Sequence, residues 1–125
     1  MAAHRTASWQ PISATWAQGQ IGADGALTQH GFARRTDYIP VKPGDKIRND
    51  GPATGRNNIF VTMYVHEYNG TTWIRRTYLQ PNGASVCTIQ SGSNQVRLTF
   101  AYGSSSGMTM TQADVEQYAK PMMLE

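Results

Sequence analysis

The chain has 125 residues, the size of one domain, with 39% hydrophobic residues and a net charge of +3. Its basic residues are scattered, with doublets only at 34–35 and 75–76, so we expect no nucleic-acid partner. Its one cysteine, Cys87, excludes an intrachain disulfide framework and is expected to be a small core residue. No long apolar run is present, and we therefore expect no signal peptide in this chain and no membrane partner.

Short strands and turns are predicted through the first half of the chain. The segment 32–41 is expected to be extended as far as Pro40. The next four residues, 42–45, place Pro43 and Gly44 at the positions that a type II turn favours. A short strand follows at 46–49, and 50–58 is a polar loop rich in Gly and Pro.

The longest β-rich run, 59–68, carries apolar groups on both faces. One face has Ile59, Val61, Met63 and Val65, and the other has Phe60, Tyr64 and Tyr68. Such a strand is either covered on both sides or has an aromatic, functional face. The dipeptide Asn69-Gly70 is a strong hairpin signal, because both residues tolerate positive φ, and it predicts a return strand over 72–79.

The last third of the chain is predicted to add three strands and one helical turn. Strands are expected at 84–90 and 95–102, the second with a buried face (Val96, Leu98, Phe100, Tyr102) and a solvated face (Gln95, Arg97, Thr99). A flexible loop follows at 103–107. Thr111 and Asp114 predict a capped helical turn over 112–117. A final strand within 118–124 is expected at a sheet edge, because Pro121 has no N–H to donate.

About eight short strands with frequent turn signals predict an all-β fold, an antiparallel β-sandwich that occupies 1–125 as one domain. Trp9 and Trp16 are expected to pack the N-terminal segment against its core.

Several segments carry a resemblance, in the same order along the chain. They are Trp16, 19–22 (GQIG), 35–44 (RTDYIPVKPG), 63–68 before Asn69-Gly70, 96–98 (VRL), 110–115 (MTQADV) and 119–125 (AKPMMLE). Together they resemble jelly-roll, carbohydrate-binding-module-like domains of phage and prophage tail proteins of gut bacteria.

The resemblance implies a jelly-roll-like sandwich excised from a longer protein, located on a virion or an extracellular surface. It also implies a glycan partner and a homo-oligomer formed through the parent tail protein. The ending Leu124-Glu125 is then native, the alternative being a cloning remnant. Because a fold hosts many functions, glycan binding follows from the resemblance by association only.

Residue types for catalysis are sparse. The histidines, His4, His30 and His66, are far apart and lack metal-ligand spacing. Most carboxylates lie at turns, and neither a nucleophile elbow nor a phosphate loop is present. We therefore expect a protein that is not an enzyme and has no cofactor. Related sugar-binding modules often carry a structural calcium, and three loop acids could supply its oxygens: Asp24, Asp45 and Asp50.

The hairpin at 64–78 has the composition that sugar binding requires. An aromatic ring stacks on the apolar face of a pyranose, and planar polar side chains bind its hydroxyls. The candidate glycan-binding residues are Tyr64, His66, Tyr68, Trp73, Arg75 and Arg76. Alternation predicts that Trp73 and Arg75 share one face of the return strand, and that Arg76 lies on the other. The alternative is that these rings pack in the core or form cross-strand pairs that stabilise the sheet.

The expected function is that of a non-catalytic carbohydrate-binding module of a phage tail or cell-surface protein, binding host or environmental glycans. The alternative is a structural or oligomerisation domain of a tail protein with no glycan ligand. Exposed rings that converge in a groove would favour binding, and a flat apolar patch would favour protein contact.

Overall fold

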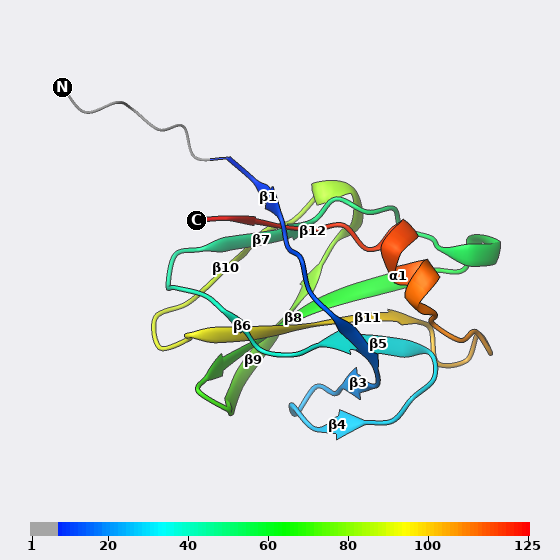
Figure 1. Cartoon of the computed structure of the whole chain (residues 1–125), viewed down its shortest axis with the longest axis horizontal. Coiled ribbons are helices and arrows are strands. Elements are labelled where there is room, and N and C mark those ends of the chain that lie inside the picture. The colour runs from blue at the N-terminus through cyan, green and yellow to red at the C-terminus, as the bar shows by residue number, and fades with distance from the viewer. Residues whose placement is uncertain (1–7) are drawn as a thin grey trace.

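Two antiparallel sheets pack face to face over residues 8–125, the part of the chain that the computed structural model describes (Figure 1). The four-stranded sheet has the order β1 (Gln10–Pro11), β12 (Pro121–Leu124), β7 (Lys46–Asn49), β10 (Cys87–Thr88). The six-stranded sheet has the order β2 (Trp16–Gln18), β5 (Ala33–Thr36), β11 (Gln95–Tyr102), β8 (Val61–Asn69), β9 (Thr72–Leu79), and β6 (Ile39–Pro40) also pairs with β11. The predicted all-β sandwich is confirmed.

The core lies between the two sheets and follows the alternation of the two longest pairing strands. In β8 and β11 the cross-strand pairs Val65–Leu98 and Met63–Phe100 are buried and face the four-stranded sheet. Trp16 closes this core from β2 with its ring edge-on to Phe100, 6.5 Å between centroids, as expected for this tryptophan. Cys87 is buried in β10, where burial raises the pKa of its thiol; it is the small core residue predicted.

A small third layer covers part of the outer face of the six-stranded sheet. It is the hairpin of β3 (Gln20–Ile21) and β4 (Leu27–Thr28), which lies against β11 and β5 (Figure 1). This hairpin buries Ile21, and the ring of Tyr38 packs on the guanidinium of Arg97 at 4.5 Å. The predicted solvated face of β11 is therefore wrong, because Arg97 and Thr99 are only 9% and 2% exposed.

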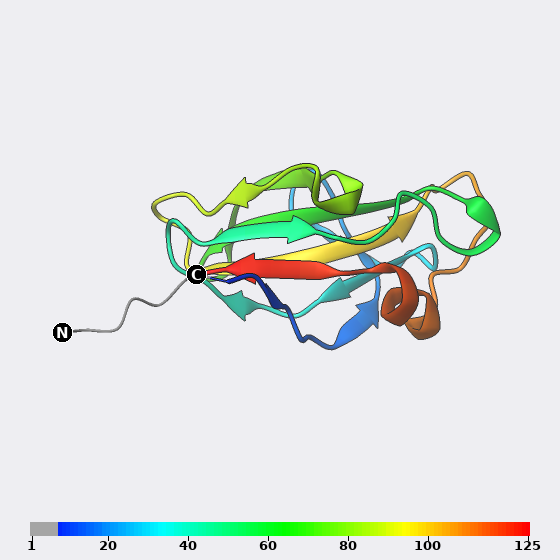
Figure 2. The same ribbon diagram turned by 90° about the horizontal axis from the view of Figure 1, so that it is seen from above.

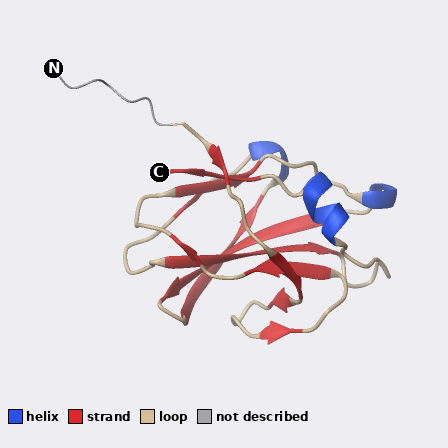
Figure 3. Ribbon diagram, in the orientation of Figure 1, coloured by secondary structure: helices blue, strands red, loops and turns tan. Residues whose placement is uncertain are grey.

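The helical segments are short and lie in connections between strands. The helix α1 (Gln112–Tyr118) lies at one end of the sandwich (Figures 2 and 3), and Thr111 and Asp114 form the predicted capping box at its start. Two short 3₁₀ turns, η1 (Arg56–Asn58) and η2 (Pro81–Gly83), lie in connections between strands. None of the helices within residues 8–125 combines the length and the apolar character needed to cross a membrane.

The final strand corrects another expectation. Pro121 was expected to confine it to a sheet edge, but β12 lies between β1 and β7. Pro121 is the first residue of the strand, where its missing N–H leaves the ladder intact, and its carbonyl accepts the N–H of Ile12 at 2.9 Å.

Candidate functional site

An open pocket of about 450 Å³ lies on the outer face of the six-stranded sheet. It is lined by Gln20, His30, Phe32, Thr62, Tyr64, Arg76, Ala101, Tyr102, Gly103 and Ser104. These residues come from β3, the segment that leads into β5, the neighbouring strands β8 and β9, and the end of β11 with the loop that follows it. We call this site the outer-face pocket.

One wall of the outer-face pocket is built by aromatic pairing across β8 and β9. Tyr64 lies directly opposite Tyr78, with 5.5 Å between ring centroids. The guanidinium of Arg76 lies over the Tyr64 ring at 4.4 Å, a cation–π contact that holds the charge beside the pocket. Phe60, four residues before Tyr64 and on the same side of the chain by alternation, is 73% exposed. Exposed rings therefore extend along this face of the hairpin beyond the pocket itself.

The other wall comes from the segment between β4 and β5. The imidazole of His30 stacks on Phe32, with 4.8 Å between centroids and 15° between planes. Gln20 adds a side-chain amide from β3, and Ser104 adds a hydroxyl. Rings, an amide, a hydroxyl and a guanidinium thus converge on one hollow, and no carboxylate is among the lining residues.

The six residues predicted to bind a ligand are not all brought together. Tyr64 and Arg76 line the outer-face pocket. His66 and Tyr68 lie on the same face but are fully buried, His66 beneath Trp73 and Tyr68 against Tyr38 and Arg97. Trp73 is half-buried, since its ring abuts the backbone of Gly25 in the β3–β4 turn.

Arg75 lies on the opposite face of β9, which corrects the expectation that it shares a face with Trp73. A β-bulge pairs Tyr68 with Trp73 and Glu67 with Arg75, so that Ile74 is an extra residue on β9. The extra residue shifts the alternation by one position. As a result, Trp73 faces His66 and donates its indole N–H to Nδ1 at 3.2 Å.

Arg75, whose side chain is 41% exposed, binds a carboxylate that is buried between the two sheets. It forms an ion pair with the fully buried carboxylate of Glu67 and donates a second hydrogen bond to the carbonyl of Thr88 at 2.9 Å. The other oxygen of Glu67 accepts the N–H of Gln90 and the hydroxyl of Ser93, each at 3.0 Å. The carboxylate is therefore satisfied on both oxygens, as a buried charge must be.

Beside the outer-face pocket, buried polar groups gather further along the same face of the sheet. His66 has its pKa lowered to about 4, chiefly by burial and then by the charges of Arg76 and Arg97, so its ring is neutral. Arg97 donates two hydrogen bonds to the hydroxyl of Tyr68, at 3.0 and 2.8 Å. Within residues 8–125, Nε2 of His66, the hydroxyl of Thr99 and Nε of Arg35 are buried without a hydrogen-bond partner.

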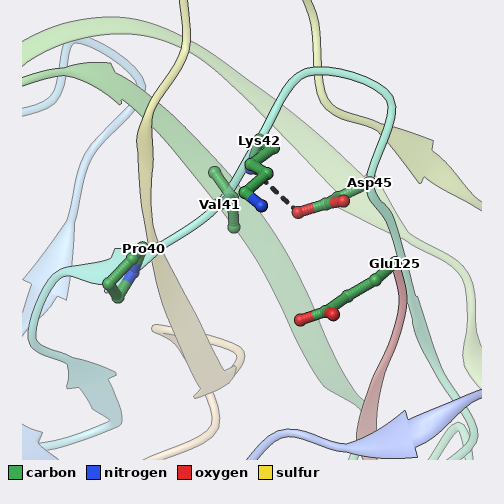
Figure 4. A pocket seen from close by; sticks show the side chains of 5 residues that line it. All are labelled: Pro40, Val41, Lys42, Asp45 and Glu125. Atoms are coloured by element: carbon green, nitrogen blue, oxygen red, sulfur yellow. Dashed lines mark hydrogen bonds between the residues drawn. The ribbon is translucent and has the colours of Figure 1, made fainter.

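The loop acids considered for calcium are each used locally. Asp24 accepts the N–H of Ala26, Asp45 accepts the N–H of Lys42 at 2.8 Å, and Asp50 pairs with Arg48. Figure 4 shows Asp45 and Glu125 on one side of a second pocket, of about 400 Å³. No three His, Cys, Asp or Glu side chains in the described part of the chain are placed to hold a metal ion. Asp24, Asp45 and Asp50 thus do not come together as one group of carboxylates.

Comparison of the chain with protein-family models, with curated proteins and with solved structures gave no match. The resemblance to tail-protein domains stays a prediction. The function is therefore inferred from the geometry of the chain itself.

Proposed function

We propose that this chain is a non-catalytic carbohydrate-binding module and that a saccharide binds in the outer-face pocket. One observation carries the proposal: aromatic and planar polar side chains from five separate segments converge on an open hollow. Its volume of about 450 Å³ is within the range of roughly 300–1,000 Å³ that is typical of small-ligand sites.

The lining groups suit the two surfaces of a sugar. Tyr64 and Phe32 contribute aromatic rings to the lining, and aromatic rings stack on the apolar C–H side of a pyranose. Gln20, Ser104 and Arg76 offer the donors and acceptors that hydroxyls need. A typical glycosidase depends on a pair of carboxylates beside the bound sugar. The pocket lining contains no carboxylate, which supports binding without hydrolysis.

We further propose that the parent is a phage tail or cell-surface protein, on a virion or an extracellular surface, where several copies of the module would act together. Weak single-site binding then becomes strong through avidity. The alternative, a structural or oligomerisation domain, is favoured by the position of β9 as the last strand of its sheet, since an edge strand can pair with a second copy.

The test is a glycan array with the purified domain, repeated with Tyr64→Ala. We expect selective binding that weakens by about 3- to 10-fold or more in the variant, from the loss of ring stacking. Tyr118→Ala is the matched control, because this half-buried tyrosine lies on α1 and does not line the pocket. Circular dichroism should first establish that both variants fold.

Two results would contradict the proposal. Either no glycan binds at all, or Tyr64→Ala binds as well as the unmodified domain. A concentration-dependent oligomer in light scattering, together with no glycan binding, would favour the assembly function.

A further inference from the structure

We infer that the saccharide bound in the outer-face pocket is acidic and that Arg76 binds its anionic group. The inference rests on the proposed function and adds the chemical class of the ligand to it. It follows from where the positive and negative charges of the chain lie.

Positive charge gathers on the outer face of the six-stranded sheet. Arg35, Arg76 and Arg97 all lie on this face, on β5, β9 and β11, as the strand register shows. None of these three arginines forms an ion pair within residues 8–125, where the salt bridges are formed by other arginines: Arg48, Arg56 and Arg75. The face therefore carries cationic charge that no carboxylate of the described chain neutralises at short range.

No carboxylate of residues 8–125 lines the outer-face pocket, and four of the eight have partners elsewhere. Glu67 points between the sheets toward Arg75, and Asp114 caps α1 and binds Arg56. Asp50 pairs with Arg48 beside the four-stranded sheet, and Asp24 accepts a backbone N–H within its own turn. Since none of them lines the outer-face pocket, an anionic ligand would meet no repulsion from its immediate walls.

Arg76 lines the pocket and has hydrogen-bond donors available to bind an anion. Its guanidinium lies over Tyr64, which in turn contacts Tyr78, so the aromatic pair holds the charged group against the pocket. The side chain is exposed and makes no hydrogen bond to any residue in the 8–125 range. A guanidinium fork with free donors fits two oxygens of a carboxylate or a sulfate, whereas a single hydroxyl uses only one donor.

The buried groups beside the pocket, further along the same face of the sheet, favour the same sign of ligand charge. Arg97 is 9% exposed and is hydrogen-bonded to a neutral phenol, that of Tyr68. Nε of Arg35 and Nε2 of His66 are further buried nitrogens with no acceptor in the described part of the chain. Because His66 is already neutral, the field at the surface comes from the arginines, and it attracts an anion.

The opposite wall is suited to the uncharged part of the same ligand. Phe32, with His30 stacked on it, offers an apolar surface, and Gln20 offers an amide for hydroxyl groups. A sugar ring held at this wall would turn its acidic substituent toward Arg76. The pocket thus has one aromatic and one cationic side, as an acidic saccharide requires.

The experiment is an array of acidic glycans (uronate-containing, sialylated and sulfated), each beside its neutral counterpart made by carboxyl reduction or desulfation. The domain is tested unmodified and as Arg76→Gln, Arg76→Lys and Lys42→Gln. Lys42→Gln is the matched control, since it removes one exposed positive charge from the turn before β7, away from the outer-face pocket.

We expect acidic glycans to bind more tightly than their neutral counterparts, with the hits identifying carboxylate or sulfate as the anionic group. Arg76→Gln should weaken acidic-glycan binding by about 10-fold or more. Arg76→Lys should retain part of the affinity, and Lys42→Gln should retain nearly all of it. Binding should also weaken between about 0.05 M and 0.5 M NaCl, as screening of a partly exposed ion pair predicts.

The two proposals fail in different ways. The inference that the ligand is acidic is refuted if neutral counterparts bind as tightly as acidic glycans, or if Arg76→Gln and Lys42→Gln change the affinity for acidic glycans equally. The proposal of carbohydrate binding would stand in either case. If no glycan of either kind binds, the proposed function itself is refuted, and this inference falls with it.

Discussion

Acidification is expected to destabilise the folded chain through His66. This imidazole is fully buried, and its Nδ1 accepts the indole N–H of Trp73 at 3.2 Å, so in the neutral ring the proton resides on Nε2. Protonation would add a charge in a buried site near Arg76 and Arg97 and would remove the acceptor that Trp73 uses. Burial and these two charges accordingly lower the pKa of His66 from 6.5 to about 4.

The sign of the pH effect follows from the direction of this shift. The pKa of His66 is lower in the folded chain than in the unfolded chain, so the unfolded chain binds the proton more strongly. The stability due to the neutral ring is therefore fully present above pH 6.5 and is lost as the pH falls toward 4. Linkage gives a loss of about 2 kcal/mol between about pH 7 and pH 5, with a limit of roughly 3 kcal/mol.

Urea unfolding, followed by tryptophan fluorescence at several pH values, measures this loss. The control is His66→Asn, whose amide oxygen keeps an acceptor for Trp73 but does not titrate. The variant is expected to be less stable than the unmodified protein at about pH 7, because a smaller side chain fills the site. Between about pH 7 and pH 5, however, its free energy of unfolding should fall by about 2 kcal/mol less than that of the unmodified protein. Equal pH dependence in the two proteins would refute the reasoning.

Three further changes test other parts of the fold. Glu67→Ala should lower the free energy of unfolding, measured in urea, by about 3 kcal/mol, because it leaves Arg75, the Gln90 N–H and the Ser93 hydroxyl without their acceptor. A decrease of less than about 1 kcal/mol would contradict a stabilising role for this network. Thr111→Ala should lower the free energy of unfolding by about 1 kcal/mol, because it removes the N-cap of α1, and Thr111→Ser should keep most of the original stability. Equal destabilisation by both substitutions would argue against the cap. Gly25→Ala, at φ +84°, would place a Cβ 2.5 Å from Cγ of Trp73, so the β3–β4 hairpin must move and the fluorescence of Trp73 should shift to the red. Gly70→Ala is its control, with φ +60° and open space around the Cβ, and an equal shift there would contradict contact between Gly25 and Trp73.

Local patterns predicted the centre of the fold well, because β8 and β11 are long and pair over eight consecutive positions. Over that length alternation decides which residues face the core, as Val65 and Leu98 show. The turn at Asn69-Gly70 and the cap at Thr111 were equally readable, since both depend on the chemistry of two to four neighbouring residues.

The candidate site was only half predictable, because its two walls are brought together by tertiary packing. Tyr64 and Arg76 come from the hairpin that the sequence indicated, but Gln20, His30 and Phe32 come from a segment with no periodic pattern. The bulge opposite Glu67 and Tyr68 moved Trp73 to the face of Arg76, and nothing in the strand composition marks that extra residue.

The packing also decides which substitutions report on binding rather than on folding. Trp73 is held by the hydrogen bond to His66 and by contact with Gly25, so Trp73→Ala would disturb the sheet face and the hairpin over it. A loss of binding in that variant would have two explanations. Arg76 is exposed and without a hydrogen bond among residues 8–125, and its substitution is expected to change stability by under about 0.5 kcal/mol. Loss of affinity in Arg76→Gln with unchanged stability would therefore show loss of recognition and not loss of folding.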